Sequence, residues 1–230
     1  MRSRQRPNRL RQREGGGCDE RTGLRGHLDV LDGFITGPND SVEAPLGEGG
    51  DRLHQWGYDL ASWRRPHGLE GGRTGADDDL MNEAFERMGA VVMGRRMFDL
   101  AEEPWGDDPP FHAPVFLLTH RAREPLVKEG GTTFTFVTDG IERALELAKA
   151  AAGDKDVSIA GGANAIQQYL KAGLLDEMQI HIVPVLFGDG RRLFEDLGTE
   201  PIELEGTRVI DSKDVTHLRF RPVKKDARTT

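Results

Sequence analysis

Residues 157–166 constrain the fold of this chain more than any other segment. A short, mostly apolar stretch runs into Gly161 and Gly162, and an amphipathic helix is predicted to follow, to about Lys171. A strand, a glycine turn and a helix N-terminus in this order bring backbone N–H groups and the positive end of a helix dipole against an anion such as phosphate. Glycine permits this approach because it has no side chain to hold the anion away. By itself, the segment also fits an ordinary connection between a strand and a helix.

Strands and helices alternate along most of the chain. The pattern predicts strands at 27–31, 89–94, 115–118, 133–137, 157–160 and 177–185, helices at 77–88, 141–152 and 163–172, and an antiparallel pair at 203–210 and 215–221. Residues 41–76 are rich in glycine, proline and charge, and we expect a long loop with one short helix near 52–58. The order predicts an α/β fold with three layers, α/β/α, and a mixed, mostly parallel central sheet that ends in an antiparallel hairpin.

The apolar face of the 77–88 helix is expected to carry Leu80, Ala84, Phe85 and Met88. The segment 179–187 and the strand at 215–221 hold more apolar side chains than one sheet face can easily cover. We therefore expect a homodimer with C2 symmetry.

Charge is unevenly distributed along the chain. Residues 1–26 contain eight arginines and three acidic residues, a net charge of +5, whereas the whole chain carries −8 and the remainder therefore −13. The first 26 residues have few large apolar side chains, so we expect a disordered basic extension, with a nucleic-acid or membrane-surface arm as the alternative. The acidic body argues against a nucleic-acid-binding core. The domain is expected at 27–223 and a C-terminal tail at 224–230.

Composition excludes several classes of protein. A single cysteine, Cys18, rules out a disulfide framework within the chain and fits a reducing cytoplasm. No apolar run approaches the length of about 18 residues that a membrane-spanning helix needs. The histidines lack the spacing of metal ligands, so no metal site is predicted, and His181 is expected on the solvated face of its strand.

Phosphate-binding groups follow three of the expected strands. The residues are Gly94, Arg95, Arg96, Thr119, His120, Gly161 and Gly162. In open α/β sheets, ligands bind at the carboxyl ends of the strands, so these groups can flank one ligand. The planar guanidinium group of arginine binds phosphate oxygens in pairs, which suits a dinucleotide.

These motifs resemble a known family when they are taken in order. The runs VVMGRRMF at 91–98, LLTH at 117–120 and IAGG at 159–162, together with residues 175–190, resemble the dihydrofolate-reductase-like superfamily. The chain is most similar to its stand-alone bacterial branch, which resembles the reductase domain of the riboflavin-biosynthesis deaminase-reductase, over about residues 28–222. The resemblance implies a dihydrofolate reductase-like fold and NADPH as the cofactor. It also implies hydride transfer to a pyrimidine- or pterin-type heterocycle or its ribosylamino precursor, as in a 5-amino-6-(5-phosphoribosylamino)uracil reductase. The zinc deaminase signature is absent from the chain.

The resemblance also implies a role for each residue of the site. The expected cofactor-binding residues are Ile35, Gly94, Arg95, Arg96, Thr119, His120, Gly161, Gly162, Ala163 and Asn164. The glycine turns and the two arginines would hold the phosphates, the Thr119–His120 pair would lie near the adenosine 2′-phosphate, and Ile35 would face the nicotinamide. Asp32 would address the substrate as the catalytic carboxylate, although Asp32-Gly33 also fits a simple turn.

The chain departs from the family pattern at three positions. Met81 stands near the place where dihydrofolate reductases have a carboxylate, Val30 replaces a usual serine, and Ala160 replaces a common acid. We therefore expect poor turnover of dihydrofolate, because the proton step lacks its acid. The alternatives are a dihydrofolate reductase that uses a different acid, a non-catalytic NADPH-binding module, and a structural homodimer whose basic tail recruits a partner.

Overall fold

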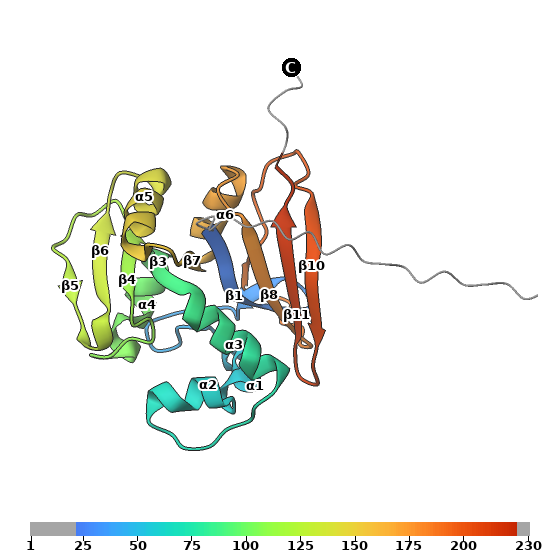
Figure 1. The fold of residues 1–230 in the computed structure, drawn as a ribbon. Helices are drawn as coiled ribbons and strands as arrows, with labels where there is room; N and C mark the ends of the chain where they lie inside the picture. Colours follow the sequence, from blue (N-terminus) through green and yellow to red (C-terminus); the bar gives the residue numbers. More distant parts are fainter. Residues whose placement is uncertain (1–21, 225–230) are drawn as a thin grey trace, which may run out of the picture.

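A nine-stranded sheet runs through the part of the chain that the computed structural model describes, residues 22–224 (Figure 1). Its strand order is β10-β11-β8-β1-β7-β3-β4-β6-β5. The strands are β1 (Thr22–Val30), β3 (Met88–Gly94), β4 (Pro114–Leu118), β5 (Leu126–Val127), β6 (Thr133–Val137), β7 (Asp156–Gly161), β8 (Glu177–Val183), β10 (Leu204–Asp211) and β11 (Thr216–Pro222). The predicted extension falls mostly outside the described residues, as do residues 225–230 of the predicted tail.

The sheet is parallel in its centre and antiparallel at both edges. The six central strands, β8, β1, β7, β3, β4 and β6, run parallel to one another. At one edge β11 and β10 form the antiparallel hairpin, and at the other the short strand β5 pairs antiparallel with β6. The predicted mixed, mostly parallel sheet with a terminal hairpin is confirmed, and β5 is an additional strand.

Alternate residues of β3 pack against different helices. Ala90 and Val92 belong to a core cluster with the helices α5 and α6, whereas Val91 and Met93 belong to a cluster with Phe98 of α4. These helices are α4 (Arg95–Trp105), α5 (Ile141–Ala152) and α6 (Ala163–Lys171). Because successive side chains of a strand point to opposite faces, the helices cover the two faces of the sheet. The predicted three-layer α/β/α arrangement is therefore confirmed.

Strand β1 begins earlier than its sequence suggests. Residues 22–26, assigned to the basic extension, form the first part of this strand. Thr22 and Gly23 pair with Val157 and Ser158 of β7, while residues 23–30 pair with β8. A strand with neighbours on both sides gains backbone hydrogen bonds along both edges, and this tertiary pairing outweighs the weak strand propensity of the segment. The boundary predicted at residue 26 is wrong by five residues.

The segment between β1 and α3 contains more regular structure than expected. Two short helices, α1 (Gln55–Tyr58) and α2 (Ala61–Arg64), lie where one was predicted, with 3₁₀ turns before and after them. Trp56 and Leu60 help to form a second core cluster with Val183 of β8. Two further strands, β2 (Phe34–Thr36) and β9 (Arg191–Arg192), pair with each other to form a small ribbon. Neither was predicted.

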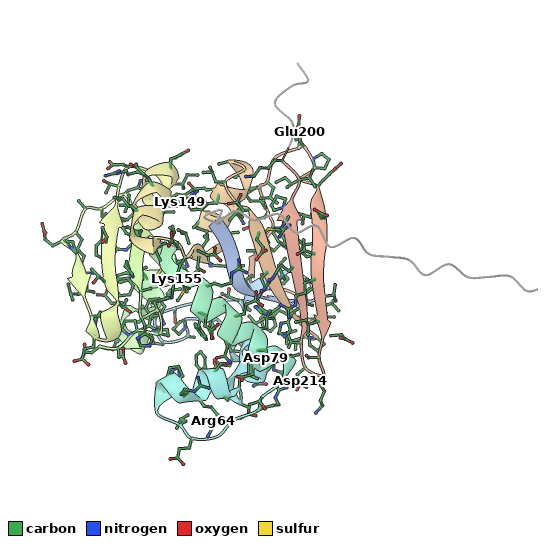
Figure 2. The ribbon with its side chains drawn as sticks, viewed as in Figure 1. Arg64, Asp79, Lys149, Lys155, Glu200 and Asp214 are labelled. Atoms are coloured by element: carbon green, nitrogen blue, oxygen red, sulfur yellow. The ribbon has the colours of Figure 1, made fainter. Side chains whose placement is uncertain are left out.

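Helix α3 (Ala76–Arg87) begins close to its predicted start, and Leu80 of the predicted apolar face is buried. Phe85, expected on the apolar face, is 39% exposed, so that prediction is wrong. Asp77 and Asp78 are buried instead, whereas Asp79 is exposed (Figure 2). Charged pairs therefore contribute much of the contact between this helix and the sheet.

His181 is buried, contrary to the prediction of a solvated position. Its side chain is 1% exposed, because β11 pairs with this part of β8 and the Trp56 ring packs on the imidazole, with ring centroids 5.3 Å apart. The Nδ1 atoms of His181 and His217 lie 2.5 Å apart, and His217 Nε2 lies 3.1 Å from the Asp77 carboxylate. No local pattern in the sequence indicates this cluster, because its members lie up to 140 residues apart.

The apolar segments from which a homodimer was predicted are buried to different degrees. Strand β8 is almost fully buried, whereas most residues of β11 are half-buried and Leu186 is 69% exposed. The homodimer stays a prediction. Among residues 22–224, no helix has the length and apolar character that crossing a membrane requires.

Candidate functional site

A cleft of about 1040 Å³ opens at the carboxyl ends of β3, β4 and β7. The residues at these strand ends form one wall, and parts of the segment 43–63 form another. All the predicted cofactor-binding residues line it, namely Ile35, Gly94, Arg95, Arg96, Thr119, His120, Gly161, Gly162, Ala163 and Asn164. The structure thus brings together the whole set from segments far apart in the sequence. Their binding of a cofactor remains a prediction.

The two glycine turns contact each other. A Cβ atom added to Gly94 would lie 3.2 Å from the backbone nitrogen of Gly162 and 3.5 Å from the carbonyl oxygen of Gly161. Gly161 has a φ of +133°, which favours glycine, and the Gly161–Gly162 peptide bond is cis. Helix α4 begins directly after the first turn, and α6 begins directly after the second. Two helix N-termini with their free N–H groups therefore border the cleft next to backbone that no side chain covers.

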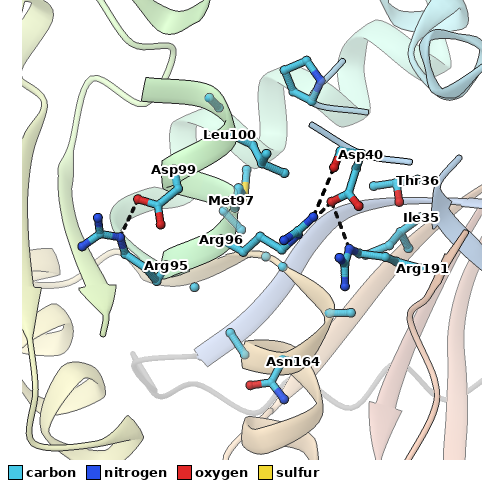
Figure 3. A pocket seen from close by; sticks show the side chains of 18 of the residues that line it. Ile35, Thr36, Asp40, Arg95, Arg96, Met97, Asp99, Leu100, Asn164 and Arg191 are labelled. Atoms are coloured by element: carbon cyan, nitrogen blue, oxygen red, sulfur yellow. Dashed lines mark hydrogen bonds and ion pairs between the residues drawn. The ribbon is translucent and has the colours of Figure 1, made fainter. Parts of the chain in front are cut away.

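The arginines after Gly94 have different partners (Figure 3). Arg95 donates to the Asp99 carboxylate at 2.5 Å, and its guanidinium carbon lies 5.8 Å from the centre of the Phe98 ring. Arg96 reaches across the cleft and donates to Asp40 at 2.8 Å. Both arginines remain partly exposed and can offer further N–H groups to an anion in the cleft.

Asp40 joins two arginines that lie far apart in the sequence. Its carboxylate accepts hydrogen bonds from Arg96 at 2.8 Å and from Arg191 of β9 at 3.0 Å (Figure 3). Burial acts to raise the pKa of Asp40, but the hydrogen bonds and charges of the two arginines outweigh it and hold the pKa at about 2. Sequence reasoning missed both Asp40 and Arg191, because 151 residues separate them and neither belongs to a motif.

The end of β4 contributes a hydroxyl group and further positive charge. Thr119 Oγ1 accepts a hydrogen bond from the backbone of Arg121 at 3.0 Å, which fixes the turn after the strand. His120 and Arg121 are exposed and line the cleft. This turn therefore presents charge beside the two glycine turns, as the sequence predicted.

The opposite wall is aromatic. His54, Tyr58 and Trp63 line the cleft, with ring centroids 6.3 Å apart for the first pair and 5.4 Å for the second. Burial lowers the pKa of His54 to about 4, against smaller effects of Asp51 and of a hydrogen bond with the Gly50 backbone. His54 is therefore uncharged near neutral pH. Trp56 packs in the second core cluster, while Trp63 packs against that cluster and also borders the cleft.

Asp32 does not line the cleft. Its carboxylate accepts hydrogen bonds from the backbone N–H groups of Phe187 at 3.1 Å and Gly188 at 2.8 Å. Burial acts to raise the pKa of Asp32, and these two backbone bonds outweigh it, so the pKa is lowered. These hydrogen bonds connect the turn after β1 to the loop after β8. A catalytic role for Asp32 stays a prediction, and this geometry does not favour it.

Met81 packs within the second core cluster and borders a small inner cavity beside Trp56 and His181. Of the two carboxylates near it in sequence, Asp79 is exposed and Glu83 is held by arginines. Neither lines the cleft. Over the described part of the chain, no group of three histidine, cysteine or acidic side chains is placed to hold a metal ion.

Comparisons with known proteins show the family and agree with the fold. The model of the RibD C-terminal domain family matches residues 30–218. The fold is similar to that of a protein from Shewanella sp. PV-4 that is named for riboflavin biosynthesis, with a TM-score of 0.61 and 22% identity, over 89% of this chain and 99% of that one. It is also similar to a diaminohydroxyphosphoribosylaminopyrimidine deaminase/5-amino-6-(5-phosphoribosylamino)uracil reductase from Thermotoga maritima, with a TM-score of 0.53 and 15% identity.

The second of these similarities covers 89% of this chain but only 57% of the Thermotoga maritima chain. A curated relative, the uncharacterized protein YyaP of Bacillus subtilis strain 168, is 28% identical over 128 residues, which are 53% of this chain and 68% of YyaP. At these identities, the solved structures establish a shared fold.

Proposed function

The chain belongs to the RibD C-terminal domain family, and we propose that it is an NADPH-dependent reductase of a pyrimidine-type substrate, similar to the reductases of riboflavin biosynthesis. The acceptor would be a flat nitrogen heterocycle or its ribosylamino precursor. The reaction would reduce a C=N bond to a CH–NH bond, with hydride added at carbon and a proton taken up at nitrogen. The observation that carries this proposal is the meeting of three strand ends, two glycine turns and two arginines along one cleft.

The residues of the cleft fit a dinucleotide phosphate. A Cβ at Gly94 would crowd the Gly162 backbone, so the two turns leave bare N–H groups beside the helix N-termini. Arg95 and Arg96 would add guanidinium N–H groups for the phosphates, and Thr119 and His120 would face the 2′-phosphate. Ile35, which also lines the cleft, offers an apolar contact for a flat ring.

NADPH supplies the hydride when it is bound, and the task of the protein is to align donor and acceptor. Strand-end residues would fix the cofactor, and the aromatic residues of the opposite wall would hold the acceptor against it. Orientation of this kind lowers the barrier because the reactants no longer lose their freedom of motion at the moment of reaction.

Titration of NADPH, followed by nicotinamide fluorescence, tests the cofactor site. Arg95→Ala removes charge-assisted hydrogen bonds of about 1.5–3 kcal/mol each and should weaken binding roughly ten- to hundredfold. Gly161→Val should also weaken it, because a side chain at a φ of +133° strains the turn and blocks the backbone. Arg143→Ala is the matched control, since Arg143 pairs with Glu146 on α5 and does not line the cleft. Unchanged affinity in both test variants would refute the site.

Turnover distinguishes the proposed reductase from the alternatives. NADPH oxidation is measured with a ribosylaminopyrimidine and with dihydrofolate in parallel. We expect poor turnover of dihydrofolate, because Met81 offers no proton and missing general acid assistance costs about 10²–10⁴-fold in rate. Tight NADPH binding with no oxidation by any acceptor would instead support a non-catalytic module.

A further inference from the structure

A small inner cavity adjoins the aromatic wall of the cleft. Its volume is about 70 Å³, and Trp56, Ser62, Met81 and His181 are among the residues that line it. The residues that line both the inner cavity and the cleft are His54, Tyr58 and Trp63. One water molecule takes up about 30 Å³ of the liquid, so the inner cavity has room for more than a single water. It is large enough for the edge of a small ring whose face lies on the aromatic wall.

Two polar side-chain atoms beside the inner cavity lack a partner. The indole nitrogen Nε1 of Trp56 and the hydroxyl oxygen of Ser62 are buried and make no hydrogen bond with any residue that the structure describes. The two residues are 7% and 4% exposed, so bulk water does not satisfy them. A buried polar atom without a partner costs free energy, and such atoms are rare in folded proteins. The inner cavity is the open space next to both side chains, and a molecule bound there can supply the missing partners.

Other contacts already hold the two residues in place. The Trp56 ring packs on His181 and His217, with ring centroids 5.3 and 5.0 Å apart. The backbone N–H of Ser62 donates to the buried Asp78 carboxylate at 2.7 Å. Neither contact uses the indole nitrogen or the hydroxyl group, so the packing of the helices α1 and α2 does not explain these two atoms. Because their positions are fixed in advance, a ligand that binds them does not have to order them.

The two atoms require a particular pair of groups in a ligand. An indole N–H only donates, so Trp56 needs an acceptor such as a carbonyl oxygen. The Ser62 hydroxyl donates or accepts, so it can also take up an N–H group. A lactam edge of a heterocycle, in which a carbonyl stands next to a ring N–H, offers both groups. The Met81 thioether beside them provides a polarizable surface for the ring itself.

We propose that the inner cavity is a recognition pocket for the acceptor, and that Trp56 and Ser62 determine specificity by binding the carbonyl oxygen and the N–H group of a lactam edge. This inference rests on the proposed reductase function and assigns residues that select its acceptor. The ring enters the inner cavity by this edge, and the rest of the acceptor stays in the cleft, where the cofactor is expected.

Substitutions that remove one polar atom each test the proposal. Binding of 5-amino-6-(ribosylamino)uracil to the full chain is measured by calorimetry at saturating NADP⁺. Trp56→Phe and Ser62→Ala should each weaken binding about two- to tenfold, the usual net value of one hydrogen bond. Urea unfolding should show no loss of stability in Ser62→Ala, because the hydroxyl has no partner within the protein. Unchanged affinity in both variants would show that the inner cavity holds only ordered water and would overturn the proposal, and so would failure of the wild type to bind the probe.

The matched control is Ser158→Ala. Ser158 of β7 is 4% exposed, as Ser62 is, but it lines neither the cleft nor the inner cavity. Its loss should leave the affinity for the probe unchanged, and an effect as large as that of Ser62→Ala would overturn the proposal. Ser62→Leu places a larger side chain beside the inner cavity and should weaken probe binding more than Ser62→Ala. Binding at wild-type affinity in folded Ser62→Leu would also contradict the pocket.

The indole N–H resonance of Trp56 gives a direct signal of hydrogen bonding. It is identified in nitrogen-15-labelled protein by its loss in Trp56→Phe. The probe should shift this resonance downfield, because a carbonyl oxygen then accepts from the N–H, whereas NADP⁺ alone should leave it in place. A resonance that stays in place with the probe bound would overturn the proposal.

NADPH affinity is measured in the same variants, so the two ideas fail separately. Neither Trp56 nor Ser62 lines the cleft, and NADPH should bind equally well to both variants. If NADPH binds and reduces the probe while the variants bind the probe like the wild type, the pocket inference fails and the reductase function stands. If NADPH does not bind, the reductase function fails, whatever the probe shows.

Discussion

The cleft and the contact of α3 with the sheet use the same charged residue types in opposite ways. In the cleft, Arg95 and Arg96 each bind one carboxylate and remain partly exposed to the open volume. Beneath α3, Arg219 and Glu83 each bind several partners, and the Arg219 side chain is only 13% exposed. An arginine that keeps unused N–H groups can bind a ligand. A charged side chain whose polar atoms all have partners within the protein stabilises the fold instead.

The α3 contact contains two linked groups of polar side chains. In the first, the Asp77 carboxylate accepts hydrogen bonds from Ser212, His217 and Arg73. The other ring nitrogen of His217 contacts His181. In the second, Glu83 binds Arg87, Arg208 and Arg219 at 3.2, 2.8 and 2.9 Å. The charged side chains of the α3 contact hold a helix against the sheet, whereas those of the candidate site border a cleft.

The largest effect on stability is expected from Asp77→Ala. Its carboxylate is 7% exposed, and its removal leaves Ser212 and His217 without their acceptor. We expect the free energy of unfolding to fall by about 3 kcal/mol, the scale for breaking a buried charged pair. Urea unfolding measures the loss, and NADPH affinity of the folded variant should stay unchanged.

The matched control is Asp79→Ala, an exposed acid in the first turn of the same helix (Figure 2). Its loss should stay below about 1 kcal/mol, the scale of a helix-dipole interaction. Equal losses in the two variants would contradict the structural role assigned to the buried cluster. A large loss of NADPH affinity in Asp77→Ala would show that the α3 contact also determines binding in the cleft, which would contradict the separate roles of the two regions.

A smaller effect is expected from Glu83→Gln, and it depends on pH. Burial acts to raise the pKa of Glu83, but Arg219, Arg208 and Arg87 outweigh it and hold the pKa at about 2, below the ordinary 4.5. A lowered pKa in the folded state stabilises the fold above about pH 4.5, and this contribution is lost as the pH falls towards 2. At pH 7 the variant should be about 1–2 kcal/mol less stable, since the carboxylate is 31% exposed and partly screened.

Urea unfolding of both proteins from pH 7 to pH 2 checks this dependence. The difference between wild type and Glu83→Gln should shrink as the pH falls and should be nearly absent at about pH 2. A difference that stays constant over this range would show that the charge of Glu83 contributes nothing and that only its shape matters.

The smallest effect is expected from removing residues 1–21. Strand β1 begins at Thr22 and lies between the two regions. It pairs with β7, which ends at the cleft, and with β8, which takes part in the contact of α3 with the sheet. Deleting residues 1–21 should therefore leave the melting temperature within about 3 °C. Deleting residues 1–26 also removes the pairing of Thr22 and Gly23 with β7, and should lower it by more than about 5 °C. Equal melting temperatures for both deletions would show that the start of β1 adds no stability.

The sequence predicted the elements that depend on neighbouring residues. Residues 133–137 and 141–152 form the expected strand and helix, and the glycine turns at Gly94 and Gly161 stand at the carboxyl ends of β3 and β7. Apolar periodicity and glycine conformation are local properties, so a short segment is enough to predict them. Parallel strands bring their carboxyl ends to one edge, and for that reason nine of the ten predicted cofactor residues line one cleft, while Ile35 reaches it from the separate strand β2.

Only the tertiary structure decided the partners of the charged groups. Asp32 was expected in the site, but it binds the backbone of Phe187 and Gly188, more than 150 residues away. Asp40 was unremarked in the sequence, yet it links Arg96 and Arg191 across the cleft. Both carboxylates lie outside helices, where no partner three or four residues away is in reach, and their partners depend on which N–H groups the whole fold brings within about 3 Å. Burial of charge is therefore a property of the assembled chain, whereas a glycine turn is already determined by its own few residues.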